Sequence, residues 1–231
     1  MPHTFTRGFR VRYYECDPFG HLSNPNYLRY TQETAFDASA EAGFSRRKYE
    51  EMGRIWVIRQ SEIEYLQPLW FDDYVEVHTW VSDFRRATSR RRFELIQPDG
   101  GELVARGFSD WVFLNRDNGL PAQIPPEVQA GFFPEGIPQS FPAREPFPSA
   151  PPPPPGVFTV RRRVAWHDLD PAGHVNNAMY LNFADDCGMQ AVAAFGWPVQ
   201  RMQTTGVAIL IRKNQIQYLQ PAQLDDELEV A

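Results

Sequence analysis

The sequence predicts an α+β protein built from two tandem copies of one unit, in which one long helix packs against an antiparallel sheet. The first observation is a repeated phrase: residues 17–28 read DPFGHLSNPNYL, and residues 170–181 read DPAGHVNNAMYL. The offset of 153 residues (170 − 17) holds without a gap over residues 10–73 of the first copy. A period this long indicates a duplicated domain rather than a solenoid of short repeats. The second observation is that each copy has one long helical pattern, and strand-like segments follow it.

The first copy begins with a strand, a loop and the helix. Aromatic and polar residues alternate over residues 4–14, as in a half-buried strand. The repeated phrase follows as a loop. Asn24-Pro25 then predicts the start of a helix, because Asn caps an unpaired amide and Pro fits the first helical position. The helix is expected to run to about residue 42 and to end at Gly43. Residues that are mostly small recur at helical spacing and form a stripe along one face of this helix, the helix stripe: Tyr27, Thr31, Ala35, Ala38 and Ala42.

Strand-like segments fill the rest of the first copy. We expect strands at about 54–67, 73–83, 87–97 and 102–115, with Asp99-Gly100-Gly101 turning the last two into a hairpin. The expected core combines the helix stripe with residues of these strands, namely Ile63, Tyr65, Val75, Val77, Phe93, Leu95, Trp111 and Phe113. The second copy repeats the helix, from a cap at Asn177 to a stop at Gly196.

Proline sets the domain boundaries. From residue 118 onward the many prolines cannot donate to a sheet, so we expect a connection with at most a short helix at about 127–132. The predicted units are therefore 1–133 and 157–231, joined by a Pro-rich linker over 134–156. Its five consecutive prolines predict an extended, semi-rigid spacer. A ligand for an SH3 or WW domain is the alternative interpretation.

The second copy lacks a counterpart of residues 79–115. It would therefore hold half a sheet with an open edge, which is an aggregation hazard. The sequence suggests a truncated version of a longer product, in which the missing strands would complete the second unit.

Composition narrows the classes of function. The formal net charge is −6 and the pI is about 5.4, which argues against nucleic acid or an anionic membrane surface as a general partner. The N-terminus lacks the apolar segment of a signal peptide, and the longest aliphatic run, 207–211, is too short to span a bilayer. We expect a cytoplasmic protein. Cys16 and Cys187 occupy unrelated positions in the two copies, so neither a disulfide framework nor a cysteine metal site is indicated.

The repeated phrase places an aspartate in a turn just ahead of a helix start. A helix N-terminus carries about half a positive charge and a row of unpaired amides. A carboxylate there can attack a carbonyl or deprotonate a water, while the amides receive the oxyanion. The phrase is thus suited to acyl chemistry. The structural alternative is that Asp17 only caps the turn and that Gly20 occupies a position with positive φ.

These residues also carry a family resemblance. The segment Glu15-Cys16-Asp17-Pro18-Phe19-Gly20, followed by Pro25-Asn26-Tyr27 and Arg29, resembles the signature of the 4-hydroxybenzoyl-CoA thioesterase family of hotdog-fold acyl-CoA thioesterases, which includes the YbgC-like enzymes. The resemblance covers nearly all of residues 5–132, and residues 158–231 as an incomplete second copy. It implies a double hotdog, in which two helix-and-sheet units form a pseudo-dimer within one chain. Further assembly into a homo-oligomer is left open.

The resemblance implies roles for four pairs of residues. Asp17 and Asp170 match the catalytic carboxylate. The backbone amides of Asn24 and Asn177 are the implied oxyanion donors. Gly20 and Gly173 allow close approach of the thioester. His21 and His174 either orient the carboxylate or water, or are simply bonded within their loops.

The second copy additionally resembles the acyl-ACP thioesterases of plants and bacteria, through Trp166-His167-Asp168-Leu169-Asp170 and the following His174-Val175-Asn176-Asn177. That family places Asn two residues after the aspartate, where this chain has Ala172, and Phe19 in the first copy. Its triad-like mechanism and an ACP substrate are therefore not established by the resemblance.

An arginine cluster suggests how a carrier is held. By resemblance, Arg85 and Arg86 match the place where these thioesterases put arginines against the phosphates of CoA, and Arg90 follows in the same cluster. Arginine binds phosphate bidentately, which suits that role. The alternative is a solvated strand face.

A metal site is the weaker interpretation of the second phrase. His167, Asp168, Asp170 and His174 are suitable ligand types, but the first copy has Tyr14 and Glu15 in place of the first two. We predict no metal.

The sequence thus leads to one main hypothesis and two rivals. The main hypothesis is an acyl-CoA thioesterase of lipid metabolism that releases free acid and CoA without a cofactor. One rival is a non-catalytic protein that binds acyl-CoA or acyl-ACP. The other is a hydratase of enoyl thioesters.

Overall fold

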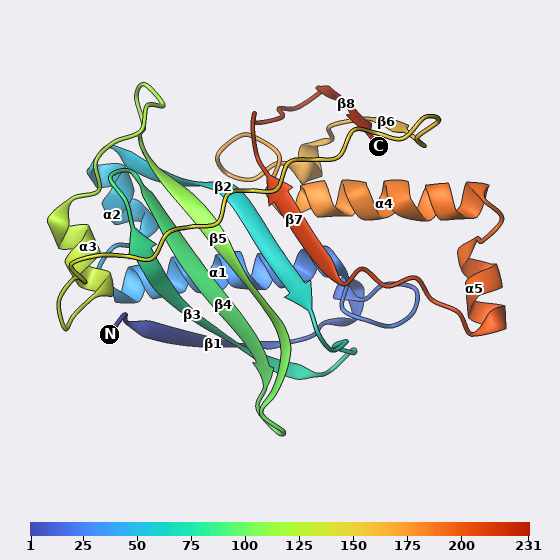
Figure 1. Cartoon of the computed structure of the whole chain (residues 1–231), viewed down its shortest axis with the longest axis horizontal. Coiled ribbons are helices and arrows are strands. Elements are labelled where there is room, and N and C mark those ends of the chain that lie inside the picture. Colours follow the sequence, from blue (N-terminus) through green and yellow to red (C-terminus); the bar gives the residue numbers. More distant parts are fainter.

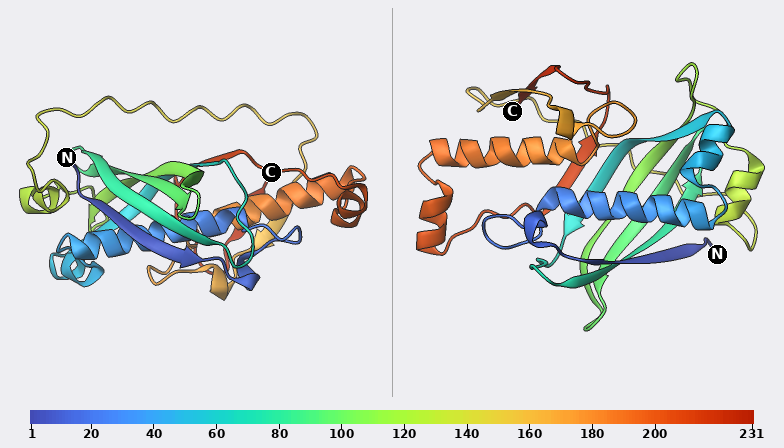
Figure 2. Two further views of the ribbon diagram at one scale, coloured as in Figure 1. Left: turned by 90° about the horizontal axis from the view of Figure 1, so that it is seen from below. Right: turned by 180° about the vertical axis from the view of Figure 1, so that it is seen from behind.

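A six-stranded antiparallel sheet wraps around one long helix, α1 (Asn24–Glu41), in the computed structural model, which describes residues 1–231 (Figure 1). The strands, in their order across the sheet, are β1 (Thr4–Arg10), β3 (Tyr74–Phe84), β4 (Thr88–Gln97), β5 (Glu102–Asn115), β2 (Arg54–Tyr65) and β7 (Lys213–Gln217). Figure 2 shows α1 lying along one face of this sheet. The predicted α+β architecture is confirmed.

The core lies between α1 and the inner face of the sheet. All eight strand residues predicted for the core are buried, and Val75, Val77, Leu95 and Phe113 have no exposed surface. The helix stripe is buried as far as Ala38. A second apolar cluster, around Phe113, packs beneath two short helices, α2 (Arg46–Glu51) and α3 (Pro126–Phe132). None of the helices of the structure combines the length and apolar character needed to cross a bilayer.

Several element boundaries differ from the prediction. The first strand ends at Arg10, because the Glu15 carboxylate accepts hydrogen bonds from the Arg12 N–H at 2.9 Å and the Tyr30 hydroxyl at 2.6 Å and folds residues 13–15 into a 3-10 turn. The N-cap of α1 is Ser23, so Asn24 is the first helical residue and its side chain makes no capping bond.

The second helix, α4 (Met179–Ala194), has Ala178 rather than Asn177 at its N-cap. Gly43 and Gly196 follow the ends of the two helices as predicted, with φ of +90° and +88°.

The second unit joins the first through a shared sheet. Strand β7 pairs antiparallel with β2, from Gln60 opposite Gln217 to Glu64 opposite Lys213. Two further strands, β6 (Val160–Arg163) and β8 (Glu227–Val230), form a separate antiparallel pair. A short helix that the sequence did not predict, α5 (Val199–Thr205), follows α4. A continuous backbone ladder therefore connects the two units.

Helices α1 and α4 meet near their N-termini and run in opposite directions. The Arg29 guanidinium donates to the Asn182 side-chain oxygen at 2.8 Å. These two residues are separated by the same 153 positions as the two phrases, so they are equivalent in the two copies. The helices thus pack about an approximate twofold relation, which brings each helix start close to the other helix.

The chain between α3 and β6 contains no helix or strand and passes over the face of the sheet opposite α1 (Figures 1 and 2). Arg144 anchors it: the Arg144 guanidinium pairs with the Asp83 carboxylate and donates to the Thr88 hydroxyl at 3.3 Å. Asp83 has only 4% of its side chain exposed. The proline-rich segment is therefore held against the first unit by a largely buried ion pair.

Candidate active site

The two acidic turns have the same backbone geometry. In the first, the Asp17 N–H donates to the His21 carbonyl at 2.7 Å and the Gly20 N–H donates to the Asp17 carbonyl at 2.9 Å. The equivalent bonds of the second turn measure 3.0 and 2.9 Å. Both glycines have positive φ, +90° at Gly20 and +83° at Gly173, which a residue with a side chain rarely adopts.

The two oxygens of the Asp17 carboxylate have different surroundings. Oδ1 accepts the N–H groups of Phe19 at 2.8 Å and His21 at 3.1 Å, so it holds the turn. Oδ2 accepts no hydrogen bond, and His21 Nδ1 lies 3.9 Å away, too far for a hydrogen bond. The side chain is 31% exposed. The structural and chemical interpretations of Asp17 are therefore compatible, because each uses a different oxygen.

The histidines lie beside their carboxylates without bonding to them. The His21 ring packs edge-on to Trp70, with 4.4 Å between the ring centroids, and 18% of its side chain is exposed. His174 Nδ1 lies 3.9 Å from Asp170 Oδ1, and this oxygen accepts the Ala172 N–H at 2.8 Å. The distance from histidine to carboxylate is thus the same in both turns, but His21 approaches the free oxygen of Asp17 and His174 the oxygen of Asp170 that holds the turn.

Both amides that were predicted to receive an oxyanion are unpaired. No hydrogen bond of the structure has the backbone N–H of Asn24 or Asn177 as its donor. A tyrosine holds the carbonyl of each residue: the Tyr65 hydroxyl donates to the Asn24 oxygen at 3.4 Å, and the Tyr218 hydroxyl donates to the Asn177 oxygen at 3.0 Å. Burial raises the pKa of both tyrosines, which keeps their hydroxyls protonated as donors.

A carboxylate from the second unit approaches the first helix start. Asp185 of α4 accepts a hydrogen bond from the Asn24 side-chain amide at 3.4 Å, and its other oxygen, Oδ1, is buried without any partner. The pKa of Asp185 is raised to about 6, chiefly by burial and to a smaller extent by the charges of Asp186 and Asp17. The sequence analysis missed this residue, because an Asp-Asp pair on a helix is usually a solvated face. The available signal was that the first copy has Gln32 at the equivalent position.

The raised pKa of Asp185 gives a testable effect of pH on stability. Its folded-state pKa of about 6 exceeds the ordinary value of 3.8, so the folded protein favours the protonated form. Wild-type stability should then fall as pH rises from 4 through 6, relative to Asp185→Asn, which cannot ionise. We expect the melting temperature of Asp185→Asn to exceed that of the wild type at pH 8, and the two to converge at pH 4. Thermal unfolding from pH 4 to 8 measures this, and a constant difference would contradict it.

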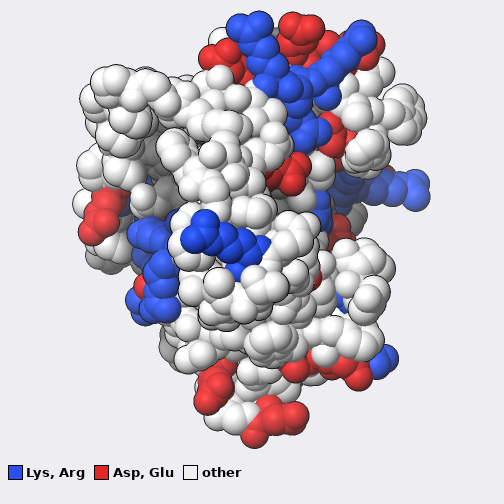
Figure 3. Space-filling model, turned by 90° about the vertical axis from the view of Figure 1, so that its right-hand side faces the viewer, with Lys and Arg blue, Asp and Glu red and all other residues white.

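A pocket of about 360 Å³ lies between the first acidic turn and the second unit. The turn contributes Pro18, Phe19 and His21, and α5 with the segment after it contributes Met202, Gln203, Gly206, Val207 and Ala208. The Gln203 side-chain amide donates to the Pro18 carbonyl at 3.1 Å, which ties α5 to the turn. Figure 3 views the side of the molecule that carries α5, where charged side chains form separate groups around a broad uncharged area. The pocket is therefore lined by no Lys, Arg, Asp or Glu side chain and lies beside the turn.

The predicted arginine cluster does not gather at either turn. Arg90 is buried and forms a bidentate pair with Asp110 at 2.7 and 2.8 Å, so its guanidinium is not available to a phosphate; this removes it from the predicted set. Arg85 and Arg86 are exposed, and Arg85 donates to the Pro142 carbonyl at 2.6 Å. Their turn lies at the end of the sheet next to α2 and α3, whereas the Asp17 turn precedes α1 at the opposite end (Figure 1).

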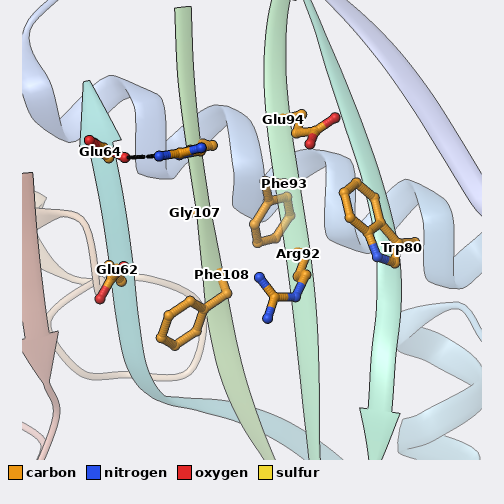
Figure 4. Close-up of a pocket in the computed structure, with 9 residues that line it drawn as sticks. Glu62, Glu64, Trp80, Arg92, Phe93, Glu94, Gly107 and Phe108 are labelled. Atoms are coloured by element: carbon orange, nitrogen blue, oxygen red, sulfur yellow. Dashed lines mark hydrogen bonds and ion pairs between the residues drawn. The ribbon is translucent and has the colours of Figure 1, made fainter. Parts of the chain in front are cut away.

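Two other features lie outside the candidate active site: the residues considered as metal ligands, and a second pocket. The four residues considered as metal ligands do not form a cluster that could hold an ion, since Asp168 is fully buried and bonds to the Ala165 N–H, while the His167 side chain is 81% exposed. A smaller pocket of about 150 Å³ lies on the sheet away from both turns, where Arg106 pairs with Glu64 at 2.8 Å (Figure 4). It includes none of the predicted site residues.

Comparison with known proteins links this geometry to thioesterases. The acyl-ACP thioesterase N-terminal domain matches residues 2–132, and the thioesterase-like superfamily matches residues 164–231. The chain is 30% identical over 190 residues to an acyl-[acyl-carrier-protein] hydrolase, FATB2, chloroplastic, of Cuphea viscosissima; the match covers 78% of this chain and 46% of the relative. The chain thus spans less than half the length of that relative.

Solved structures share the fold. The 12:0-ACP thioesterase from Umbellularia californica has a TM-score of 0.76 at 20% identity, covering 98% of this chain and 85% of that one. The gentisyl-coenzyme A thioesterase BH1999 has a TM-score of 0.51 at 23% identity, covering 55% of this chain and 99% of that one. The single-unit protein overlies about half of the chain and the plant enzyme nearly all of it, so the predicted double hotdog is confirmed. Because the domain match extends over more than half of the sequence, the chain belongs to the acyl-ACP thioesterase family.

Proposed function

We propose that this chain hydrolyses an acyl thioester to a free carboxylic acid and a thiol at the Asp17 turn. The observation that carries the proposal is that the turn and the helix start that follows it offer both a carboxylate oxygen without a hydrogen bond, Asp17 Oδ2, and an amide without an acceptor, that of Asn24. These are the two groups that thioester hydrolysis requires, one to act on the carbonyl carbon and one to receive its oxygen.

Each group has a definite part in the reaction. Asp17 acts as nucleophile or general base toward the thioester carbonyl, and the Asn24 N–H donates to the oxyanion. One such donor contributes about 2.7–4 kcal/mol to the transition state. Tyr65 supports this amide by holding the Asn24 carbonyl, and Gly20 leaves room for the thioester to approach the turn. Asp170, His174, Asn177 and Gly173 form the equivalent second site.

The carrier is either CoA or ACP, which share the phosphopantetheine arm and its thioester. Family membership supports ACP. The CoA proposal, and with it the finer assignment to the 4-hydroxybenzoyl-CoA thioesterases, rests on the motif around Asp17 and on the exposed Arg85 and Arg86. Its support is weakened because Arg90 is paired within the protein. We propose that the two units, 1–133 and 157–231, act as a pseudo-dimer and that the acyl chain enters the pocket between the Asp17 turn and α5.

The test is thiol release by the purified chain from a panel of substrates. The panel comprises benzoyl-CoA, acyl-CoAs from butanoyl to hexadecanoyl, and the same acyl groups on ACP. We expect steady release of one thiol per acid formed, and no release by the double variant Asp17→Asn/Asp170→Asn. Binding without turnover would support the non-catalytic rival. Water addition to an enoyl-CoA without thiol release would support the hydratase.

A further inference from the structure

Asp185 is a carboxylate near the proposed site that neither acidic turn supplies. It comes from α4 of the second unit, and its Oδ2 accepts the Asn24 side-chain amide at 3.4 Å. Its Oδ1 is buried and accepts no hydrogen bond. An unsatisfied buried carboxylate oxygen is costly and calls for an explanation. A substrate or a water bound at the helix start would supply the missing donor.

The groups around Asp185 are acidic or neutral. The charge of Asp17 in the turn and that of Asp186, its neighbour on α4, both raise its pKa. The Tyr65 hydroxyl of β2 lies near enough for the two groups to interact. No cation is among the groups that shift its pKa. Asp185 is therefore a carboxylate without a neutralising partner, which is the condition that makes a carboxylate basic near neutral pH.

The equivalent position in the other site carries an amide. Gln32 of α1 is the counterpart of Asp185 (185 − 153 = 32), and its side-chain oxygen accepts the Asn176 amide at 3.3 Å. The two equivalent helix positions thus both contact the other unit, Asp185 at Asn24 and Gln32 at Asn176, which is one position before the counterpart of Asn24. One of them is a carboxylate and the other a neutral amide that does not act as a base. Only the Asp17 site therefore has a carboxylate from the other unit at its helix start.

We infer that Asp185 is the general base of the Asp17 site, contributed by the second unit to complete the first. This rests on the proposed thioester hydrolysis and adds the group that activates water. Asp17 Oδ2 bonds to the acyl carbon as the C–S bond breaks, so the thiolate leaves and a mixed anhydride remains. A water then gives a proton to Asp185, and its oxygen bonds to the acyl carbon. The anhydride C–O bond breaks to restore the Asp17 carboxylate, and the proton on Asp185 passes to the thiolate.

The test uses the full chain and the acyl-CoA or acyl-ACP of the panel with the highest kcat/KM. Asp185→Asn should lower kcat by about 10²–10⁴-fold, the usual contribution of a positioned general base. Its first turnover should still release one equivalent of thiol as a burst, because the anhydride forms without Asp185. The wild-type kcat should rise through an ionisation near pH 6 that the variant lacks, because Asp185 acts after the thiol has left. Asp185→Glu should recover part of kcat.

The matched control is Asp186→Asn, which removes the exposed neighbouring carboxylate on the same helix and should leave kcat nearly unchanged. If Asp185→Asn keeps the wild-type kcat and pH profile, Asp185 is not the base, while thioester hydrolysis stands. If the wild type releases no thiol from any member of the panel, the proposed function itself fails. Should Asp185→Asn not fold, the wild-type pH profile decides alone: no ionisation between pH 5 and 7 would overturn the inference.

Discussion

Asp17→Asn is expected to lower kcat for thiol release by about 10²–10⁴-fold, whereas Asp170→Asn should leave kcat within about twofold of the wild type. The asymmetry follows from the partner of each turn. The Asp17 turn has Asp185 beside its helix start, and the Asp170 turn has Gln32 at the equivalent position. Steady-state kinetics on the two single variants and the double variant measure the share of each site.

The two variants serve as controls for each other, because the turns share one backbone geometry and the substitutions have the same shape. Gln32→Asp, which introduces a carboxylate at the second site, should raise the activity that remains in Asp17→Asn. Equal losses in the two single variants would show that the sites are equivalent and would contradict the asymmetry. A larger loss in Asp170→Asn would place turnover at the second site.

Asp110→Ala should lower the free energy of unfolding by about 3–5 kcal/mol, because it leaves a buried guanidinium without its partner. The side chains of Arg90 and Asp110 are only 7% and 9% exposed, and two hydrogen bonds join them. The Gln60 side-chain amide also donates to Asp110 at 2.7 Å and would lose its acceptor. Urea unfolding of the purified variant measures the loss.

An exposed pair provides the comparison for this change. Arg161 and Glu229 lie 3.3 Å apart with 83% and 58% of their side chains exposed, so Glu229→Ala should cost no more than about 1 kcal/mol. The double variant Arg90→Met/Asp110→Leu should recover most of the stability lost in Asp110→Ala, since both charges are removed together. Similar losses for the buried and the exposed pair would contradict this account.

The main elements of the fold could be predicted because their signals are local and repeated. Hydrophobic alternation located β2 to β5, and the two glycines of positive φ located the ends of α1 and α4. Short elements such as α2 and α5 were missed, since six or seven residues give too little periodicity. The cap of α1 is Ser23 rather than Asn24, because the Asn24 side chain bonds across the helix interface instead of to its own backbone.

Only those site residues that are contiguous in the sequence could be predicted. The turn, its glycine and its histidine are contiguous, so the duplicated phrase identified them together. Asp185 and the residues of α5 reach the Asp17 turn through the packing of the two units, which sequence spacing does not encode. The pairing of Arg90 with Asp110 was not predicted for the same reason, because Asp110 comes from the neighbouring strand.

The attachment of Arg144 to Asp83 changes how the second unit is tethered. Only 16 positions separate Arg144 from the start of β6 (160 − 144), and five consecutive prolines stiffen part of that span. A short, stiff linker keeps the two units at a high effective concentration, so the second unit binds the first in an intramolecular step that does not depend on protein concentration. The contact between Arg144 and Asp83 therefore favours reassociation of β7 with β2 whenever these two strands separate.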